Sequence, residues 1–300
     1  MTSISSFIYR LLLLSLISFH AYSNSPVWKV SHSQHHFFIA GTVHLLAKED
    51  YPLPKEFDQA YGKSDILILE ADTSQMQTPA VQQAMLNKAM YPDGVTIQSK
   101  LTAATYQALS DYCLSQGLDI KSLERFKPGL LSVMLSVTEM KRLNIAGIGV
   151  DEHFNQKARS QHVTVKFLES LEKQLSLIAN MGINQEEAFI KYTLEETKHL
   201  ESMINILKDS WRQGDLGKLN EVAIMPLKQE FPELYTSLLV NRNNDWLPQL
   251  RDMLKTKEVE LVLVGALHLA GHDGLISLLK NAGYKVERFK LEPNLIGEVQ

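Results

Sequence analysis

Two short motifs each place a histidine directly after an apolar run. FFIAGTVH contains Gly41 and His44, and LVLVGALH contains Gly265 and His268. In both motifs the histidine stands three residues after the glycine and is followed by leucine. A glycine at the end of a buried strand lets the backbone bend or lets another group approach closely. The repetition predicts that two imidazoles, remote in the chain, meet beyond the carboxyl ends of two strands, where α/β sheets bind ligands.

One carboxylate has a similar position. Glu70 ends the run DILILE, and Asp72 follows two residues later. A carboxylate is costly to bury unless it is paired or bound to a metal. His44, His268 and Glu70 would together suit zinc, manganese, cobalt or iron, with open positions for water and substrate. The alternatives are a solvated strand end for Glu70 and a local hydrogen bond for each histidine.

Other acids and one arginine are candidates for the chemistry. Glu169 and Asp151 each follow an apolar run, and either could cap a helix or face the crevice. If Glu70 is a metal ligand, Glu169 or Asp151 could be the general base, a role that Glu70 could also fill. Arg242 and Asn243 lie in a helical pattern and could hold a substrate carboxylate or a developing oxyanion. A solvated helix face would explain the same two residues.

The elements that must position these side chains alternate between strand and helix. Most strands are nearly all apolar, which is typical of strands covered on both faces. The first two are expected to form a hairpin whose turn carries His32, His35 and His36 at a wet edge of the sheet. The expected strands are residues 28–31, 37–41, 65–70, 145–150, 163–168, 259–264 and 285–289.

Helical patterns fill the spaces between these strands. They cover residues 54–62, 79–90, 102–116, 128–143 and 274–282, and residues 184–254 contain no convincing strand. The pattern predicts an α/β fold with a mixed central sheet that starts with an N-terminal hairpin and is flanked by helices. The late helical block, about residues 184–254, is expected to act as a cap. No linker-like stretch divides residues 24–300, which we expect to form one domain.

The N-terminus and the composition suggest an exported protein. Residues 1–23 combine one arginine, an apolar run and small residues, which is the pattern of an export signal cleaved near Ser23. Cleavage there predicts a periplasmic or secreted protein without a transmembrane anchor. The net charge of −4 argues against a nucleic-acid-binding protein. Cys113 is the only cysteine, so no internal disulfide forms, and its helical context predicts a buried, inert thiol.

An ordered series of motifs resembles the TraB/GumN family, which includes the Tiki metalloproteases of animals. The resemblance covers nearly all of the chain after the export signal. It implies a metal-dependent hydrolytic site with His44, His268 and Glu70, two motif glycines at positions 41 and 265, and less directly Glu169 and Arg242. The matching motifs are GTVHLL, LILEAD, KPGLLSVML, GIGVDEHF, FLESLEKQL, WRQGD, NRNNDW and VGALHLAGHDGLISLLKNAGYKVER.

These observations lead to three functional hypotheses. The first is an exported hydrolase that uses manganese, cobalt or zinc, with a peptide as the leading substrate because Tiki proteins are similar to metal-dependent peptidases. The second is a metal-independent hydrolase, similar to erythromycin esterases, in which His44 and Glu70 activate water directly on a small-molecule substrate. The third is a periplasmic protein that binds haem, metal or peptide without turnover. The oligomeric state is not predicted.

Overall fold

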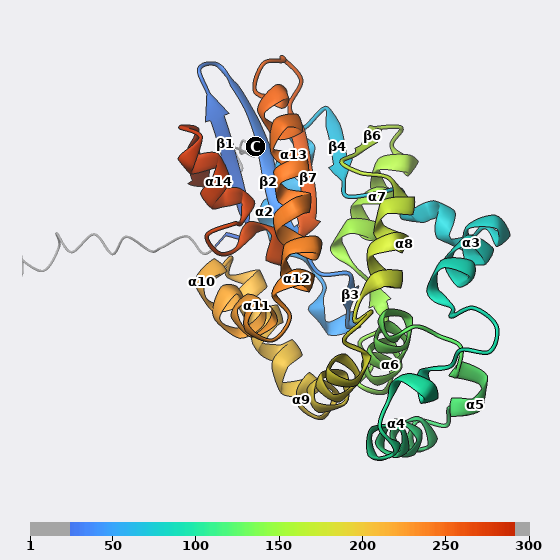
Figure 1. Ribbon diagram of the computed structural model, residues 1–300. Coiled ribbons are helices and arrows are strands. Elements are labelled where there is room, and N and C mark those ends of the chain that lie inside the picture. Colours follow the sequence, from blue (N-terminus) through green and yellow to red (C-terminus); the bar gives the residue numbers. More distant parts are fainter. Residues whose placement is uncertain (1–24, 292–300) are drawn as a thin grey trace, which may run out of the picture.

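The computed structural model describes residues 25–291 (Figure 1). The expected export signal, residues 1–23, and its cleavage near Ser23 lie outside this range. Six strands form a mixed sheet in the order β6-β4-β7-β2-β1-β8. Strands β6, β4, β7 and β2 run parallel, and β1 is antiparallel to both β2 and β8. The predicted mixed α/β architecture is confirmed. The strands are β1 (Val27–His32), β2 (His35–Thr42), β4 (Ile66–Leu69), β6 (Thr164–Phe167), β7 (Glu260–Gly265) and β8 (Lys285–Arg288).

Helices cover both faces of this sheet, as the apolar strands require. Phe38 and Ala40 of β2 face a cluster that includes side chains of α2 (Lys55–Gly62) and α7 (Val150–Ser160). Phe37 and Ile39 face the other cluster, which contains side chains of α13 (Asn241–Met253) and α14 (Leu275–Asn281). Alternate residues of one strand therefore enter two different cores, because side chains alternate across a strand. Figure 1 shows α13 and α14 in front of the sheet.

The late block is helical, as predicted, but its parts have different positions. The long helix α9 (Glu186–Arg212) passes beyond the carboxyl ends of the strands, where Trp211 Nε1 donates to the carbonyl of Gly41 at 2.7 Å. By contrast, α13 lies against the sheet with Trp246 and Leu250 fully buried. The block also contains α10 (Leu216–Leu219), η4 (Asn220–Ile224), α11 (Met225–Glu230), α12 (Pro232–Tyr235) and η5 (Thr236–Val240), and η4 and η5 are turns of π-helix.

A second group of helices packs beside the sheet, on the right of Figure 1. It has its own apolar core, which includes Leu109, Leu131 and Ile190. Cys113 is fully buried in that core, and desolvation raises the pKa of its thiol to about 11, as expected of an inert cysteine. The group contains α3 (Pro79–Ala89), η3 (Ile97–Lys100), α4 (Ala103–Ser115), α5 (Ile120–Leu123), α6 (Pro128–Arg142), α8 (Leu171–Asn180) and the first turns of α9, which contribute Ile190.

The prediction of a core strand at residues 145–150 is wrong. Only β5 (Gly147–Ile148) is extended, and it pairs with the short strand β3 (Leu45–Leu46) in a separate two-stranded sheet. Helix α7 already begins at Val150, whose N–H donates to the carbonyl of Val43. The run is apolar because its two ends enter different clusters, whereas its middle is exposed. Within residues 25–291 no helix is long and apolar enough to cross a bilayer.

Candidate active site

The carboxyl ends of four parallel strands bring the candidate side chains to one edge of the sheet. His44 follows β2, Glu70 follows β4 and Glu169 follows β6, while β7 ends at Gly265. Strand β7 lies between β2 and β4, with Thr42 opposite Gly265 and Leu69 opposite Leu263. This order makes His44 and Glu70 neighbours across the end of β7. His268 follows in the short η6 helix (Ala266–Leu269).

The three predicted metal-binding side chains surround one point beside Gly265. A Cβ atom at Gly265 would lie 3.3 Å from Glu70 Oε1, 3.7 Å from His268 Cδ2 and 3.9 Å from His44 Nε2. At Gly41 a Cβ atom would lie 2.8 Å from Cα of Ala266, so this glycine lets β2 approach the turn after β7. The two motif glycines therefore have different tasks. Gly265 leaves room for the polar groups, and Gly41 allows contact between two backbones.

Arg242 is the centre of the buried network. Its Nε donates to Glu169 Oε1 at 3.0 Å, and its Nη2 donates to the same oxygen at 2.7 Å and to Glu70 Oε2. Its Nη1 donates to the carbonyl of Leu238 at 3.2 Å and points to His268 Nε2 at 2.9 Å. A guanidinium has five N–H groups, and all five have partners here. Arg242 is only 8% exposed, so it is not part of a solvated helix face, and it has no free donor for a substrate oxyanion.

The contact between Arg242 and His268 determines the protonation state of the histidine. Because arginine only donates hydrogen bonds, Nε2 of His268 must accept, and the ring proton is on Nδ1. This nitrogen lies 2.7 Å from Asn243 Oδ1, whose amide group donates to the carbonyls of His268 and Asp273. Burial, together with the positive charges of Arg242 and His44, lowers the pKa of His268 to about 3. His268 is therefore a neutral imidazole at physiological pH.

His44, in contrast, favours its protonated form. Its Nδ1 lies 3.0 Å from Asp151 Oδ2, and 66% of its side chain is exposed. Although desolvation acts in the other direction, the hydrogen bond to Asp151 and the charges of Asp151 and Glu70 raise the pKa of His44 to about 9. Asp151 orients the ring through Nδ1, so Nε2 is left to face Gly265 and Glu70.

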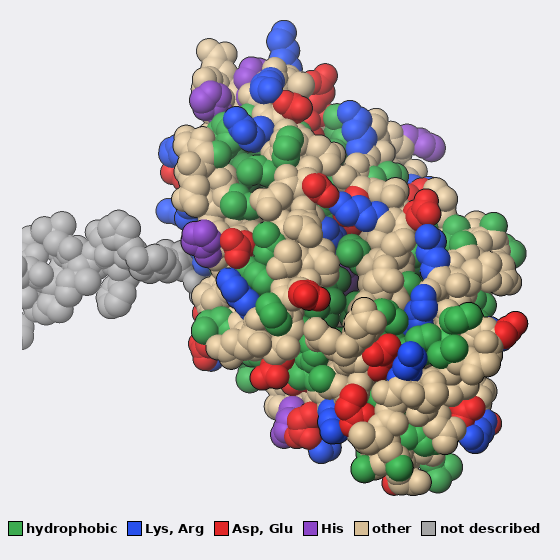
Figure 2. All heavy atoms as spheres, viewed as in Figure 1, with side chains coloured by type: hydrophobic (Ala, Val, Ile, Leu, Met, Phe, Trp, Pro, Cys, Tyr) green, Lys and Arg blue, Asp and Glu red, His purple; other side chains and the backbone are tan. Residues whose placement is uncertain are grey.

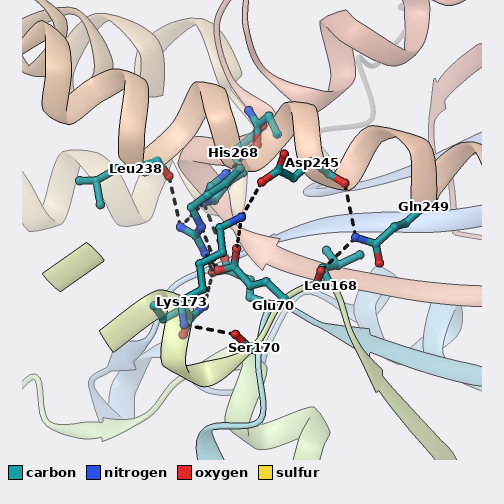
Figure 3. Close-up of polar contacts among 12 residues, drawn as sticks. Glu70, Leu168, Ser170, Lys173, Leu238, Asp245, Gln249 and His268 are labelled. Carbon is teal, nitrogen blue, oxygen red and sulfur yellow. Dashed lines mark hydrogen bonds and ion pairs between the residues drawn. The ribbon is translucent and has the colours of Figure 1, made fainter. Parts of the chain in front are cut away.

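Glu70 is an ionised carboxylate held from three sides. Its Oε1 accepts from the N–H of Gly265 at 2.6 Å, and its Oε2 accepts from Arg242 and from Gln174 at 3.1 Å. Burial opposes ionisation, but the positive charges of Arg242 and His44, together with the hydrogen bond from the Gly265 N–H, hold the pKa of Glu70 below its usual value. Figure 3 shows Glu70 and His268 at the centre of this network, with Leu238 and Lys173 at its sides.

A small cavity lies between His44 and Glu70. Its volume is about 30 Å³, and a cavity needs roughly 10–15 Å³ to hold one water molecule. There is therefore room for a water molecule beside the imidazole and the carboxylate. Arg242, Glu169 and His268 do not line this cavity. The residues that do are Thr42, His44, Leu69, Glu70, Ala71, Thr73, Asp151, Gln174 and Leu263.

Some expected residues lie elsewhere, and one important residue was not predicted. Asp72 is outside the network, because its carboxylate caps the η2 turn (Thr73–Gln77) and pairs with Arg159 at 3.2 Å. The unpredicted residue is Trp246, whose ring lies 4.5 Å from that of His268 and 4.6 Å from the guanidinium carbon of Arg242. Trp246 stands four residues after Arg242 in the sequence, and residues four apart lie on the same face of a helix. This spacing was a signal that could have identified Trp246.

The donor set does not fit a metal ion in this arrangement. Nε2 of His268 and Oε2 of Glu70 are both directed at Arg242, and Nδ1 of His44 is directed at Asp151. Among residues 25–291 no group of three or more histidine, cysteine or acidic side chains is arranged to hold a metal. A guanidinium thus occupies the position that faces two of the three expected ligands. A cation at this point would also be repelled by the charge of Arg242.

The similarity to known proteins covers almost all of the described chain. The model of the TraB/PrgY/gumN family matches residues 26–288. The uncharacterized protein YbaP of Escherichia coli (strain K12) is 26% identical over 250 residues, which cover 82% of this chain and 88% of YbaP. YbaP of Shigella flexneri is 25% identical over the same shares of the two chains. No solved structure matches the chain.

Proposed function

Because the chain belongs to the TraB/PrgY/gumN family and holds a water-sized cavity between an oriented histidine and an ionised carboxylate, we propose that it is a hydrolase of carboxylic amides or esters. The observation that carries the proposal is the cavity of about 30 Å³ beside His44, Glu70 and Asp151. A general base needs to be within reach of the water and to be oriented by a third group. His44 meets both requirements, with Asp151 as the orienting group.

The proposed reaction begins with the neutral form of His44. Nε2 accepts a proton from a water molecule in the cavity while the water oxygen bonds to the substrate carbonyl carbon. Asp151 and Glu70 stabilise the imidazolium that forms, since both carboxylates act on His44. The C–N or C–O bond then breaks, and the leaving atom takes the proton from Nε2. This sequence returns His44 to its neutral form and releases a carboxylic acid and an amine or alcohol.

The residues behind the cavity hold Glu70 in position. Arg242 binds Glu70 and Glu169, and His268 is fixed between Arg242 and Asn243. None of the four residues Arg242, Glu169, His268 and Asn243 lines the cavity. In this proposal they are positioning residues, whereas His44 and Glu70 contact the reacting water. The proposal thus assigns Arg242 and Glu169 a supporting role in place of the catalytic role that the sequence suggested.

A metal-dependent hydrolase is the second candidate. The observation that favours it is the convergence of His44 Nε2, Glu70 Oε1 and the His268 ring on one point beside Gly265. A divalent manganese, cobalt or zinc ion there would polarise water or a substrate carbonyl. Since Arg242 now faces His268 and Glu70, binding of the ion would require Arg242 to release both. Elemental analysis of protein purified without chelator, with activity before and after EDTA, separates the two candidates.

The test of the proposal is turnover. Purified protein, incubated with pools of short peptides and with p-nitrophenyl acetate, should release new carboxylic acids that mass spectrometry detects. His44→Ala should lose at least a hundredfold in rate, which is the usual contribution of a general base. His199→Ala on the exposed face of α9 is the matched control and should retain full activity. Full activity in His44→Ala would refute the assignment, and a stoichiometric complex without product would favour the binding-only alternative.

A further inference from the structure

A groove runs along α8 next to the active site. One wall consists of α8 and the residue after it, and the other wall is the segment around Leu234 and Ser237. Its volume is about 270 Å³, several times that of the water-sized cavity. Figure 2 shows the surface hollowed between α8 and the α12–α13 region, with hydrophobic side chains on its walls. The lining residues are Lys173, Ser176, Leu177, Asn180, Met181, Leu234 and Ser237.

Both walls of this α8 groove lead to the buried network. On α8, Lys173 lines the groove and the next residue, Gln174, lines the water-sized cavity and donates to Glu70. Nζ of Lys173 also lies 3.6 Å from Glu169 Oε2. On the opposite wall, Ser237 precedes Leu238, whose carbonyl accepts from Arg242. The end of the groove at Lys173 is therefore the end next to Gln174, the residue of α8 that lines the water-sized cavity.

The groove has no uncompensated charge. Lys173 is its only charged lining residue, and its ammonium pairs with Asp245 at 2.6 Å (Figure 3). Leu177, Met181 and Leu234 provide apolar surface. Ser176, Asn180 and Ser237 provide hydroxyl and amide groups, and the side chain of Asn180 makes no hydrogen bond to any other residue in the range 25–291. Apolar surface beside a few donors and acceptors fits an amphipathic ligand such as a polypeptide with an apolar side chain.

The length of the groove agrees with a short extended segment. Lys173 and Asn180 are seven residues apart on a helix, which corresponds to about 10 Å along its axis. An extended chain advances about 3.3 Å per residue, so the wall spans roughly three residues. We propose that the α8 groove binds an extended segment of a peptide substrate, with a neutral apolar side chain packed against Leu177, Met181 and Leu234. The inference rests on the proposed function for the cleavage step and names a peptide as the substrate.

The test measures binding separately from cleavage. Fluorescein-labelled hexapeptide pools carry leucine, glutamate or lysine at one central position, and anisotropy gives their affinity for the full-length protein. His44→Ala provides an inactive form, so that binding is measured without turnover. Leu177→Arg puts a charge in the groove, Asn180→Trp narrows it from an exposed position, and Leu114→Arg on the exposed face of α4 is the matched control.

We expect the leucine pool to bind at least tenfold more tightly than the glutamate and lysine pools. Leu177→Arg and Asn180→Trp should each weaken that binding at least tenfold, while Leu114→Arg leaves it unchanged. The hydrolysis of p-nitrophenyl acetate, which is too small to occupy the groove, should be the same in all four proteins with an intact His44. Equal affinities for the three pools, no peptide binding, or unchanged binding in both groove variants would overturn the inference. Peptide binding without any turnover would instead overturn the proposed function and leave the groove assignment standing.

Discussion

Nη1 of Arg242 lies 2.9 Å from Nε2 of His268, deep below the surface. This one contact forces His268 to be a hydrogen-bond acceptor at Nε2 and therefore neutral. It also removes from His268 the lone pair that a metal ion would need. The contact thus decides between two roles for the second Gly-x-x-His motif. In the arrangement observed here His268 supports Arg242, and only His44 has a ring nitrogen that faces the cavity.

Loss of the Arg242 side chain should destabilise the protein strongly. In Arg242→Gln, Glu70 and Glu169 would remain buried without their cationic partner, and breaking a buried ion pair costs about 3–5 kcal/mol. Urea denaturation followed by circular dichroism gives the free energy of unfolding. Arg251→Gln, at an exposed position of the same helix, should change it by less than about 0.5 kcal/mol. Similar values for the two variants would contradict the central position of Arg242.

Asp151 should control the pH dependence of the reaction. The base is neutral His44, whose pKa is raised to about 9, so the rate should rise with pH, reach half its maximum near pH 9 and level off above that value. Asp151→Asn removes the negative charge that raises the pKa of His44 and keeps an oxygen that accepts from Nδ1. The rising part of the profile should then shift to lower pH. An unchanged profile in Asp151→Asn would show that another group is the base.

Replacement of the two motif glycines should affect stability to different extents. Gly41→Ala would place a Cβ atom 2.8 Å from Cα of Ala266, so two backbone segments must separate, at a cost of about 1–3 kcal/mol. Gly265→Ala would place its Cβ atom 3.3 Å from Glu70 Oε1, a contact that a small shift of the carboxylate relieves. We expect Gly265→Ala to lose activity with little loss of stability. Thermal denaturation and the hydrolysis rate, measured on both variants, test this contrast.

Glu260 should make the protein less stable as the pH rises. It is 5% exposed at the start of β7, and one of its oxygens has no hydrogen-bond partner among residues 25–291. Burial, with the charges of Glu258 and Asp65, raises the pKa of Glu260 from 4.5 to about 7. As the pH rises, the unfolded chain releases the proton of Glu260 at a lower pH than the folded protein does. Stability contributed by protonated Glu260 is therefore complete below pH 4.5 and is lost as the pH rises to 7, by up to about 3 kcal/mol.

The variant Glu260→Gln isolates this effect. Because glutamine does not ionise, the variant should gain stability relative to the unmodified protein as the pH is raised from 4 to 8. Glu49→Gln, at an exposed position, serves as the control and should show no such trend. A constant difference between Glu260→Gln and the unmodified protein at all pH values would mean that Glu260 titrates near its ordinary pKa.

The fold was largely predictable because its elements have strong local signals. The apolar runs located all six strands of the main sheet, and five predicted helices, such as 128–143 for α6, agree with the structure to within a residue or two. The run at 145–150 misled because apolar composition alone does not distinguish a central strand from a short extended segment that leads into a helix. Its flanking residues enter two separate clusters, which is a property of the packed protein.

The side chains that stand at strand ends follow from the amino-acid sequence, because a glycine or an acid that interrupts an apolar run is a local feature. The sequence pattern therefore identified His44, Glu70, Glu169 and His268. The contacts among these four side chains depend instead on how the elements pack in three dimensions. Strand β7 lies between β2 and β4, and the π-helical turn η5 directly precedes α13, whose second residue is Arg242. One extra residue in a helical turn rotates the residues after it by about 100°, so the face that Arg242 occupies could not be read from α-helical periodicity. The charge of that buried arginine then sets the protonation of its neighbours, because charges interact strongly where water is absent.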